Sequence, residues 1–147
     1  AFEYAKTNAI MTESDYPYLG RRTLLPWNKK CGDAKSKGVV TVSSYTDVTP
    51  KSSSQLKAAV AKGPVSVAIE ADKMAFQGYT GGVITGSSCG TQLDHGVLAV
   101  GYGTENGQEY FLVKNSWGGS WGEDGYVKIG VDGVCGITYQ PSYPATN

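Results

Sequence analysis

The chain lacks an excess of charge of either sign and has no long hydrophobic run. Its 147 residues contain 13 basic and 13 acidic side chains, so the formal net charge is zero and the pI is near 6.8. Nucleic acids and anionic membranes attract proteins with a clear basic excess, and neither is expected as a partner here. The longest apolar stretches, such as residues 97–100, are far shorter than the roughly 20 residues of a membrane-spanning helix. No transmembrane helix is predicted.

The sequence also has few metal-ligating side chains. It contains three cysteines and one histidine, without a C-x-x-C motif or a His/Cys cluster of the kind that holds structural zinc. We therefore expect no metal and no cofactor. An odd number of cysteines indicates either one disulfide with a free thiol or a thiol whose partner lies on another chain. The three are Cys31, Cys89 and Cys135.

The start of the sequence shows no sign of a secretory leader. The first residues, AFEYAKTN, are typical of an amphipathic helix, and no charged region with an apolar segment precedes them. We expect the chain to begin in the middle of a structure. With 40% hydrophobic and 18% charged residues, its length suits one globular domain with a buried core.

The first third of the chain has one segment rich in loop-forming residues. Residues 16–55 mix Pro, Gly, Ser and Lys around a single β-rich run, VVTVSSY at 39–45. Ser52 with Gln55 three residues later forms a capping-box pattern, which predicts a short surface helix that ends before Gly63. The apolar stripe of this helix is Leu56, Ala59 and Val60.

Beyond residue 63 the pattern is that of antiparallel β-structure. Val65, Val67 and Ile69 alternate with Ser66, Ala68 and Glu70, which is typical of a half-buried strand. Three more strand candidates follow: GVLAVGYG at 96–103, EYFLVKNS at 109–116 and GYVKIG at 125–130.

The Asn106-Gly107 pair predicts a β-hairpin between the strands at 96–103 and 109–116. With these two residues at the turn centre, paired positions sum to 213, so Asn115 faces residue 98, three residues from His95. That offset is roughly 10 Å at ~3.3 Å per strand residue, and a β-bulge or a longer loop would remove it. The only histidine and Asn115 are therefore expected at the same end of one hairpin.

His95, Asn115 and Trp117 form a chemically coherent set. An imidazole that acts as a base is held in one tautomer by a hydrogen bond to one ring nitrogen, while the other nitrogen faces the nucleophile. A neutral Asn can supply the acceptor when the nucleophile is a thiolate, because the thiolate itself stabilises the imidazolium. An adjacent indole would keep water from competing for this hydrogen bond. The alternative is a packed or surface histidine without a catalytic role.

Four stretches resemble the papain-like cysteine proteases of the cathepsin L type. They are GPVSVAIEA at 63–71, DHGVLAVGYG at 94–103, KNSWGGSWGEDGY at 114–126 and CGITYQPSYP at 135–144. They occur in the family's order and spacing, and the match covers essentially all 147 residues. The resemblance implies an α+β fold, with the end of the helical left domain at 1–20, a crossover segment at 21–50 and the antiparallel β-barrel-like right domain at 51–147.

The resemblance also assigns catalytic roles. His95 is implied to be the general base and acid, and Asn115 its orienting partner. Trp117 is implied to shield their hydrogen bond, and Trp121 to form a wall on the leaving-group side. Ser116 follows Asn115, but nothing around it resembles the nucleophile elbow of a serine hydrolase.

The resemblance also implies that Trp117 and Trp121 bind substrate. Ala68, Leu93 and Gln140 are implied to form the S2 pocket, and Asp94, the neighbour of Leu93, is implied to bind substrate too. Ala68 and Leu93 favour an apolar P2 side chain. Gln140 differs from the small or apolar residue common in the family and would admit a polar P2 group, unless it faces solvent.

The family's nucleophile motif, C-G-[SA]-C-[WY], does not occur in the sequence. Its histidine lies ~130–150 residues downstream of that cysteine, which places the nucleophile roughly 35 positions before residue 1. We therefore expect the catalytic cysteine, with the oxyanion-hole glutamine and the substrate-binding glycine pair, on an upstream segment or a companion chain. The resemblance implies a Cys89–Cys135 disulfide in place of a nucleophilic role for Cys89. It pairs Cys31 with an upstream cysteine, although a free Cys31 thiol is the alternative.

Two functions from different classes remain open. The first is the C-terminal part of a cysteine endopeptidase, inactive by itself, with a peptide or protein substrate and a propeptide or cystatin-like inhibitor as partners. The second is a non-catalytic binding or storage module on a protease scaffold, for which exposed apolar surface predicts aggregation or tight pairing. Disulfides need an oxidising or lysosome-like compartment, so we expect a secreted, lysosomal or endosomal protein.

Overall fold

The computed structural model describes residues 1–17 and 34–146 and divides into two compact units. Residues 1–46 and 144–147 form the first unit, and residues 47–143 form the second. The predicted boundaries at residues 20 and 50 are not tested by this division and stay predictions. Cys31 lies outside the described residues.

The first unit contains the predicted N-terminal helix. Helix α1 (Phe2–Thr7) buries Ala5, and the ring of Phe2 stacks on Tyr45 with 5.7 Å between ring centroids. The Lys6 ammonium lies 5.1 Å from the same Tyr45 ring. The other elements here are α2 (Ala34–Lys37), β1 (Val42–Asp47) and the end of β7 (Ser142–Thr146).

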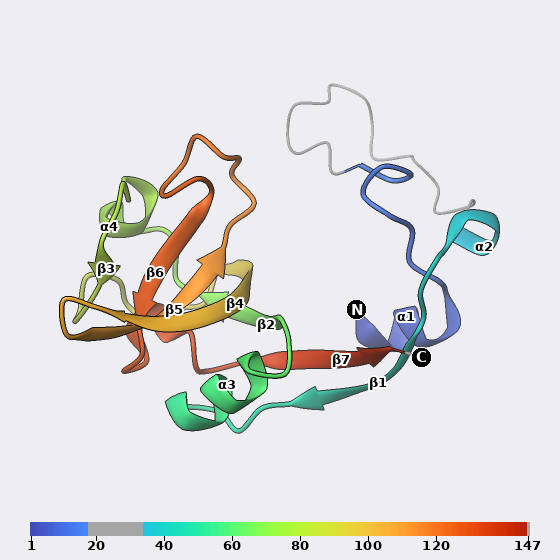
Figure 1. Cartoon of the computed structure of the whole chain (residues 1–147), viewed down its shortest axis with the longest axis horizontal. Coiled ribbons are helices and arrows are strands. Elements are labelled where there is room, and N and C mark those ends of the chain that lie inside the picture. The colour runs from blue at the N-terminus through green and yellow to red at the C-terminus, as the bar shows by residue number, and fades with distance from the viewer. Residues whose placement is uncertain (18–33, 147) are drawn as a thin grey trace. The chain divides into compact units, whose positions relative to one another are not determined.

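The second unit is a mixed sheet with short helices at its margins. Its strands run in the order β7-β2-β4-β5-β6-β3, and all described pairs are antiparallel except the parallel pair β3–β6. Figure 1 shows β4 and β5 as a long hairpin beside β6. The elements are α3 (Ser53–Val60), β2 (Val65–Ile69), α4 (Met74–Gln77), β3 (Val83–Ile84), β4 (His95–Glu105), β5 (Gln108–Lys114), β6 (Tyr126–Gly130) and a 3-10 turn at Val134–Gly136.

The β4–β5 hairpin turns at the predicted pair. Asn106 and Gly107 both have positive φ, at 49° and 79°, which is the backbone of a type I′ turn and explains why Asn-Gly is favoured there. Glu105 faces Gln108, as the turn centre requires. The hairpin prediction is therefore confirmed.

A β-bulge changes the register further along the hairpin. Ala99 pairs with Val113 and Gly101 with Leu112, so Val100 is the extra residue on β4. Leu98 consequently faces Lys114, and the expectation that Asn115 faces residue 98 is wrong by one position. The bulge shifts Asn115 toward His95, because each residue inserted in β4 draws the β5 end one position closer to the start of β4.

The core of the second unit follows from strand alternation. Val65, Val67 and Ile69 of β2 are buried, as predicted, and they belong to the same core cluster as the inward residues of β5 and β6. These inward residues are Phe111, Val113, Val127 and Ile129. Helix α3 adds Leu56, Ala59 and Val60, the predicted stripe. No helix in residues 1–17 or 34–146 is long and apolar enough to cross a membrane.

Helix α3 begins at a side-chain cap that can be tested. Ser52 has extended backbone angles, and its Oγ accepts a hydrogen bond from the Gln55 N–H at 3.3 Å. Ser52→Ala removes this acceptor and leaves a helix-terminal N–H unpaired, which we expect to cost about 1 kcal/mol of unfolding free energy in urea titrations. Ser52→Gly is the matched control, because glycine at an N-cap costs only a few tenths of a kcal/mol. Equal stability of the two variants would argue against a role for the cap.

Candidate active site

His95 is positioned by the exit of β2 and the start of β4. It pairs with Ile69 across the β2–β4 ladder, and the preceding Asp94 donates its backbone N–H to the Ile69 carbonyl at 3.0 Å. The Asp94 carboxylate in turn accepts the N–H of Ala71 at 2.8 Å. The backbone on both sides of the imidazole is therefore tied to the sheet.

Asn115 follows the last residue of β5, and a backbone hydrogen bond holds it in place. Its N–H donates to the Gly125 carbonyl at 3.0 Å, and its side chain is only 8% exposed. Gly125 has a φ of 90°, a region that disfavours other residues, and an added Cβ would lie 3.3 Å from the Gly118 carbonyl. The glycine thus lets the 116–125 loop fold back beside Asn115.

The two side chains meet in a hydrogen bond that defines the imidazole tautomer. His95 Nε2 lies 2.8 Å from Asn115 Oδ1, and the Ser116 N–H donates to the same Oδ1 at 2.8 Å. Because a backbone N–H can only donate, the shared atom is the amide oxygen. That oxygen can only accept, so Nε2 carries a proton and neutral His95 has its lone pair on Nδ1. The ring is oriented as a base at Nδ1.

The amide nitrogen of Asn115 is buried and, among the described residues, has no hydrogen-bond partner. A buried donor without a partner costs about 1–3 kcal/mol, and nearly all such groups in folded proteins are satisfied. An ordered water or a residue outside the described ranges would satisfy this donor.

An aromatic cluster packs beside the His95 imidazole. The Trp117 ring lies 5.2 Å from the imidazole, and Phe76 contacts both rings edge-on, at 6.2 Å from His95 and 5.4 Å from Trp117. Trp121 packs against Phe76 at 5.0 Å, and its indole N–H donates to the Gln77 carbonyl of α4 at 3.1 Å. Trp117 is still 41% exposed. It packs against the imidazole while part of it is open to solvent, and its shielding of the His95–Asn115 hydrogen bond stays a prediction.

Cys89 and Cys135 form a disulfide. Both cysteines in the described part of the chain are thus oxidised, and neither offers a thiolate to His95. The bond joins the segment before His95 to the 3-10 turn at Val134–Gly136, so its role is structural.

The residues predicted to bind substrate lie in different surroundings. Leu93 is half-buried against Gly136, where an added Cβ would lie 2.6 Å from Leu93 Cδ2. Ala68 is half-buried and faces Gly96 in the β2–β4 ladder, whereas Gln140 is exposed. Asp94 is exposed too, but its carboxylate is engaged with Ala71. The assignment of these residues to an S2 pocket stays a prediction.

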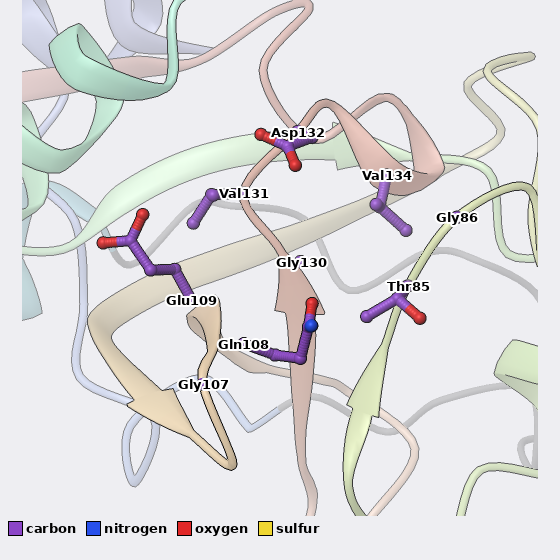
Figure 2. Close-up of a pocket in the computed structure, with 9 residues that line it drawn as sticks. All are labelled: Thr85, Gly86, Gly107, Gln108, Glu109, Gly130, Val131, Asp132 and Val134. Atoms are coloured by element: carbon purple, nitrogen blue, oxygen red, sulfur yellow. The ribbon is translucent and has the colours of Figure 1, made fainter.

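A cavity of about 450 Å³ lies at the other end of β5 from Asn115. Figure 2 shows its lining residues, which come from the β4–β5 turn and the start of β5, from the end of β6 and the residues after it, and from the segment after β3. Of its two carboxylates, Glu109 is paired with Lys57 at 2.6 Å. The cavity shares no residue with the His95 cluster. No group of three or more His, Cys, Asp or Glu side chains that could hold a metal ion occurs within the described ranges.

Comparison with known proteins identifies the family. The family model described as "Papain family cysteine protease" matches residues 1–145 of this chain. The chain belongs to the papain family of cysteine proteases. It is 52% identical to cysteine proteinase RD21A of Arabidopsis thaliana over 153 aligned residues, covering 100% of this chain and 32% of that protein. The chain thus spans about a third of this papain-family relative.

Solved papain-family structures share the fold. Digestive procathepsin L 3 of Tenebrio molitor matches with a TM-score of 0.84 and 42% identity over 98% of this chain and 46% of that one. Bromelain from Ananas comosus, solved with the E64 inhibitor, matches with a TM-score of 0.83 and 34% identity over 98% of this chain and 66% of that one. The α+β papain-like fold predicted from the sequence is confirmed.

Two residues near this papain-family site were not singled out from the sequence. Phe76 is fully buried beneath the aromatic cluster, yet α4 has only four residues and offers no periodic pattern. Glu70 is only 3% exposed, although strand alternation places it with the outward-facing polar residues. That expectation is wrong because β2 ends at Ile69 and the Glu70 N–H bonds to the Cys135 carbonyl instead.

Proposed function

We propose that this chain is the part of a cysteine endopeptidase that carries its general base, and that a segment upstream of residue 1 or a companion chain supplies the nucleophilic cysteine. The observation that carries the proposal is the His95 Nε2–Asn115 Oδ1 hydrogen bond of 2.8 Å. It fixes the proton on Nε2 and leaves Nδ1 for the thiol. Family membership supports the same chemistry.

The reaction divides the work between the thiolate and His95. Nδ1 takes the thiol proton, and the thiolate attacks the carbonyl carbon of the scissile peptide bond. The imidazolium at His95 then gives this proton to the leaving amine as the C–N bond breaks, and a thioester remains. Water attacks the thioester while Nδ1 accepts a proton from it, which releases the carboxylic acid and returns the proton to the departing thiolate.

Asn115 and Trp117 serve this cycle without reacting. Asn115 keeps the ring in one orientation while it gains and loses a proton. Trp117, 5.2 Å from the ring, limits water at the hydrogen bond, which strengthens it by lowering the local dielectric constant.

We also propose a substrate class, a regulator and a location for the whole protein. The substrate is a peptide or protein with an apolar P2 side chain, for which Ala68, Leu93 and Gln140 form the pocket. A propeptide or a cystatin-like inhibitor is the natural regulator, since relatives such as procathepsin L 3 were solved as proforms. We place the whole protein in the lysosome, the endosome or outside the cell, because the Cys89–Cys135 bond persists in such compartments.

Labelling with E64, the inhibitor bound to bromelain, tests the proposal. We expect intact protein to form a thioether adduct on a cysteine outside residues 1–147, on the same polypeptide or on a chain that copurifies. The chain of residues 1–147 alone should form no adduct and hydrolyse no peptide. Prior blocking with iodoacetamide is the control and should abolish the adduct. The absence of an adduct on any copurifying chain would refute the proposal, as would an adduct on Cys31.

A further inference from the structure

A buried carboxylate lies directly behind the segment that presents His95. Glu70 follows the last residue of β2 and is 3% exposed. Its Oε2 accepts the N–H of Gln92 at 2.5 Å, and its Oε1 lies 2.9 Å from the Lys73 ammonium. The Gln92 N–H, and after it Lys73, lower the pKa of the Glu70 carboxyl below its ordinary value. The group is therefore an anion near neutral pH.

The Glu70 carboxylate lies so close to the backbone before His95 that residue 90 has no room for a side chain. A Cβ added to Gly90 would lie 2.5 Å from Glu70 Oε2. Residues 90 and 92 thus both pack against the same carboxylate, one through the absence of a side chain and the other through its N–H. The backbone of residues 90–92 is held by Glu70 itself.

The position of Glu70 is fixed independently of this carboxylate. Its N–H donates to the Cys135 carbonyl at 2.9 Å, and Cys135 is joined by a disulfide to Cys89, the neighbour of Gly90. Two connections, one covalent and one through the carboxylate, therefore converge on the same short segment. Three residues after Gln92 comes the imidazole.

We propose that Glu70 is a positioning residue for His95, holding the Gly90–Gln92 backbone so that the ring keeps its hydrogen bond with Asn115. This inference rests on the proposed function, in which His95 is the general base. In this role Glu70 acts through the backbone of residues 90–92. Glu70 fixes residues 90–92, and the contacts of Asp94 with Ile69 and Ala71 fix the chain directly before His95. Without Glu70 the segment keeps the disulfide at its start, the packing of Leu93 on Gly136 and the Asp94 contacts at its end.

The test uses Glu70→Gln and Glu70→Ala in the full-length protein that carries the nucleophile. Per E64-titrated active site, we expect kcat to fall about 10-fold in Glu70→Gln and about 100-fold in Glu70→Ala, with KM within about 2-fold of the native value, because small misplacement of a catalytic group costs up to 100-fold. The alkaline limb of the pH profile of kcat should also shift, since this limb reports the deprotonation of the imidazolium that is paired with the thiolate.

A matched control is available in Glu123. Its carboxylate has the same kinds of partner, the Gly82 N–H at 3.2 Å and the Lys128 ammonium at 3.0 Å, but it does not touch residues 90–95. Glu123→Gln should lower stability while keeping kcat per titrated site and the pH profile. If Glu70→Gln behaves like Glu123→Gln in both respects, Glu70 is only structural and the inference is overturned.

Amide hydrogen exchange separates this inference from the proposed function. In Glu70→Gln, the amides of residues 90–95 should exchange about 10-fold faster, because a hydrogen bond to a charged group is lost. This readout does not need catalysis. If the native protein hydrolyses no peptide but the exchange rates rise, the proposed function fails while the structural hold on the His95 segment stands. Unchanged exchange in residues 90–95 would overturn the inference in an active protein as well.

Discussion

Replacing His95 by alanine should reduce kcat/KM of the full-length protein by about 10³-fold or more. Two losses combine in this variant. The thiol loses the base that makes it a thiolate, and the leaving amine loses its proton donor. Peptide hydrolysis by the purified variant, measured against native protein at equal concentration, gives the ratio. E64 labelling should slow in parallel, since alkylation also needs the thiolate.

Asn115→Ala should have a smaller effect, because it leaves the imidazole in place. Loss of a hydrogen-bonding partner that orients a functional histidine typically costs 10- to 100-fold, and we expect kcat to fall by about this amount. Lys114→Ala is the control for both variants, since Lys114 is the exposed neighbour of Asn115 at the end of β5. A His95→Ala variant that folds as the native protein does and keeps activity within about 3-fold would rule out the general-base role.

The relation between His95 and Asn115 illustrates what sequence alone can predict. The turn residues Asn106 and Gly107 fix the hairpin register from local backbone preferences, so the meeting of the two strand ends could be predicted. A bulge was one of two expected ways to bring them together, but its position at Val100 could not be predicted, because a bulge depends on how both neighbouring strands pack. The final approach to 2.8 Å comes from the side chains and from the Gly125 contact behind Asn115.

Other features depended on contacts between distant parts of the chain. Phe76 joins the site through Trp117 and Trp121, which lie more than 40 positions later in the sequence. Glu70 is buried because residues 90–92 and Cys135 surround it, and no local pattern reports such neighbours. Strand periodicity instead places Glu70 outward. The strands β3 and β7 were likewise absent from the prediction, since β3 has only two residues and β7, SYPAT, shows no apolar alternation.

The position of the site at strand ends has a consequence for its rigidity. His95 begins β4, Asn115 follows β5, and each is tied to a neighbouring strand or loop by backbone hydrogen bonds. Residues 89–94, by contrast, have no ladder partner before His95 and depend on Glu70, Asp94 and the disulfide. Of these three supports, the disulfide acts over the longest chain separation, and its removal should have the largest effect on stability.

Removing the disulfide with Cys89→Ala and Cys135→Ala together should lower the unfolding free energy by about 4 kcal/mol, the chain-entropy expectation for a closed loop of this length. The two cysteines are 46 positions apart and both are buried. Alanine avoids placing a hydroxyl in the core, which serine would do. Urea unfolding measures the loss, and the melting temperature should fall by about 10 °C.

The disulfide and Glu70 should differ in what they change, even though they support the same segment. A cross-link stabilises mainly by restricting the unfolded chain, whereas the Glu70 carboxylate acts on the folded geometry. The double alanine variant should therefore lose stability while keeping more of its kcat per titrated site than Glu70→Ala. Ser87→Ala, an exposed change in the same loop, should alter neither quantity. A loss below about 1 kcal/mol in the double variant would contradict the chain-entropy argument and would leave hydrogen bonding as the main support of the His95 segment.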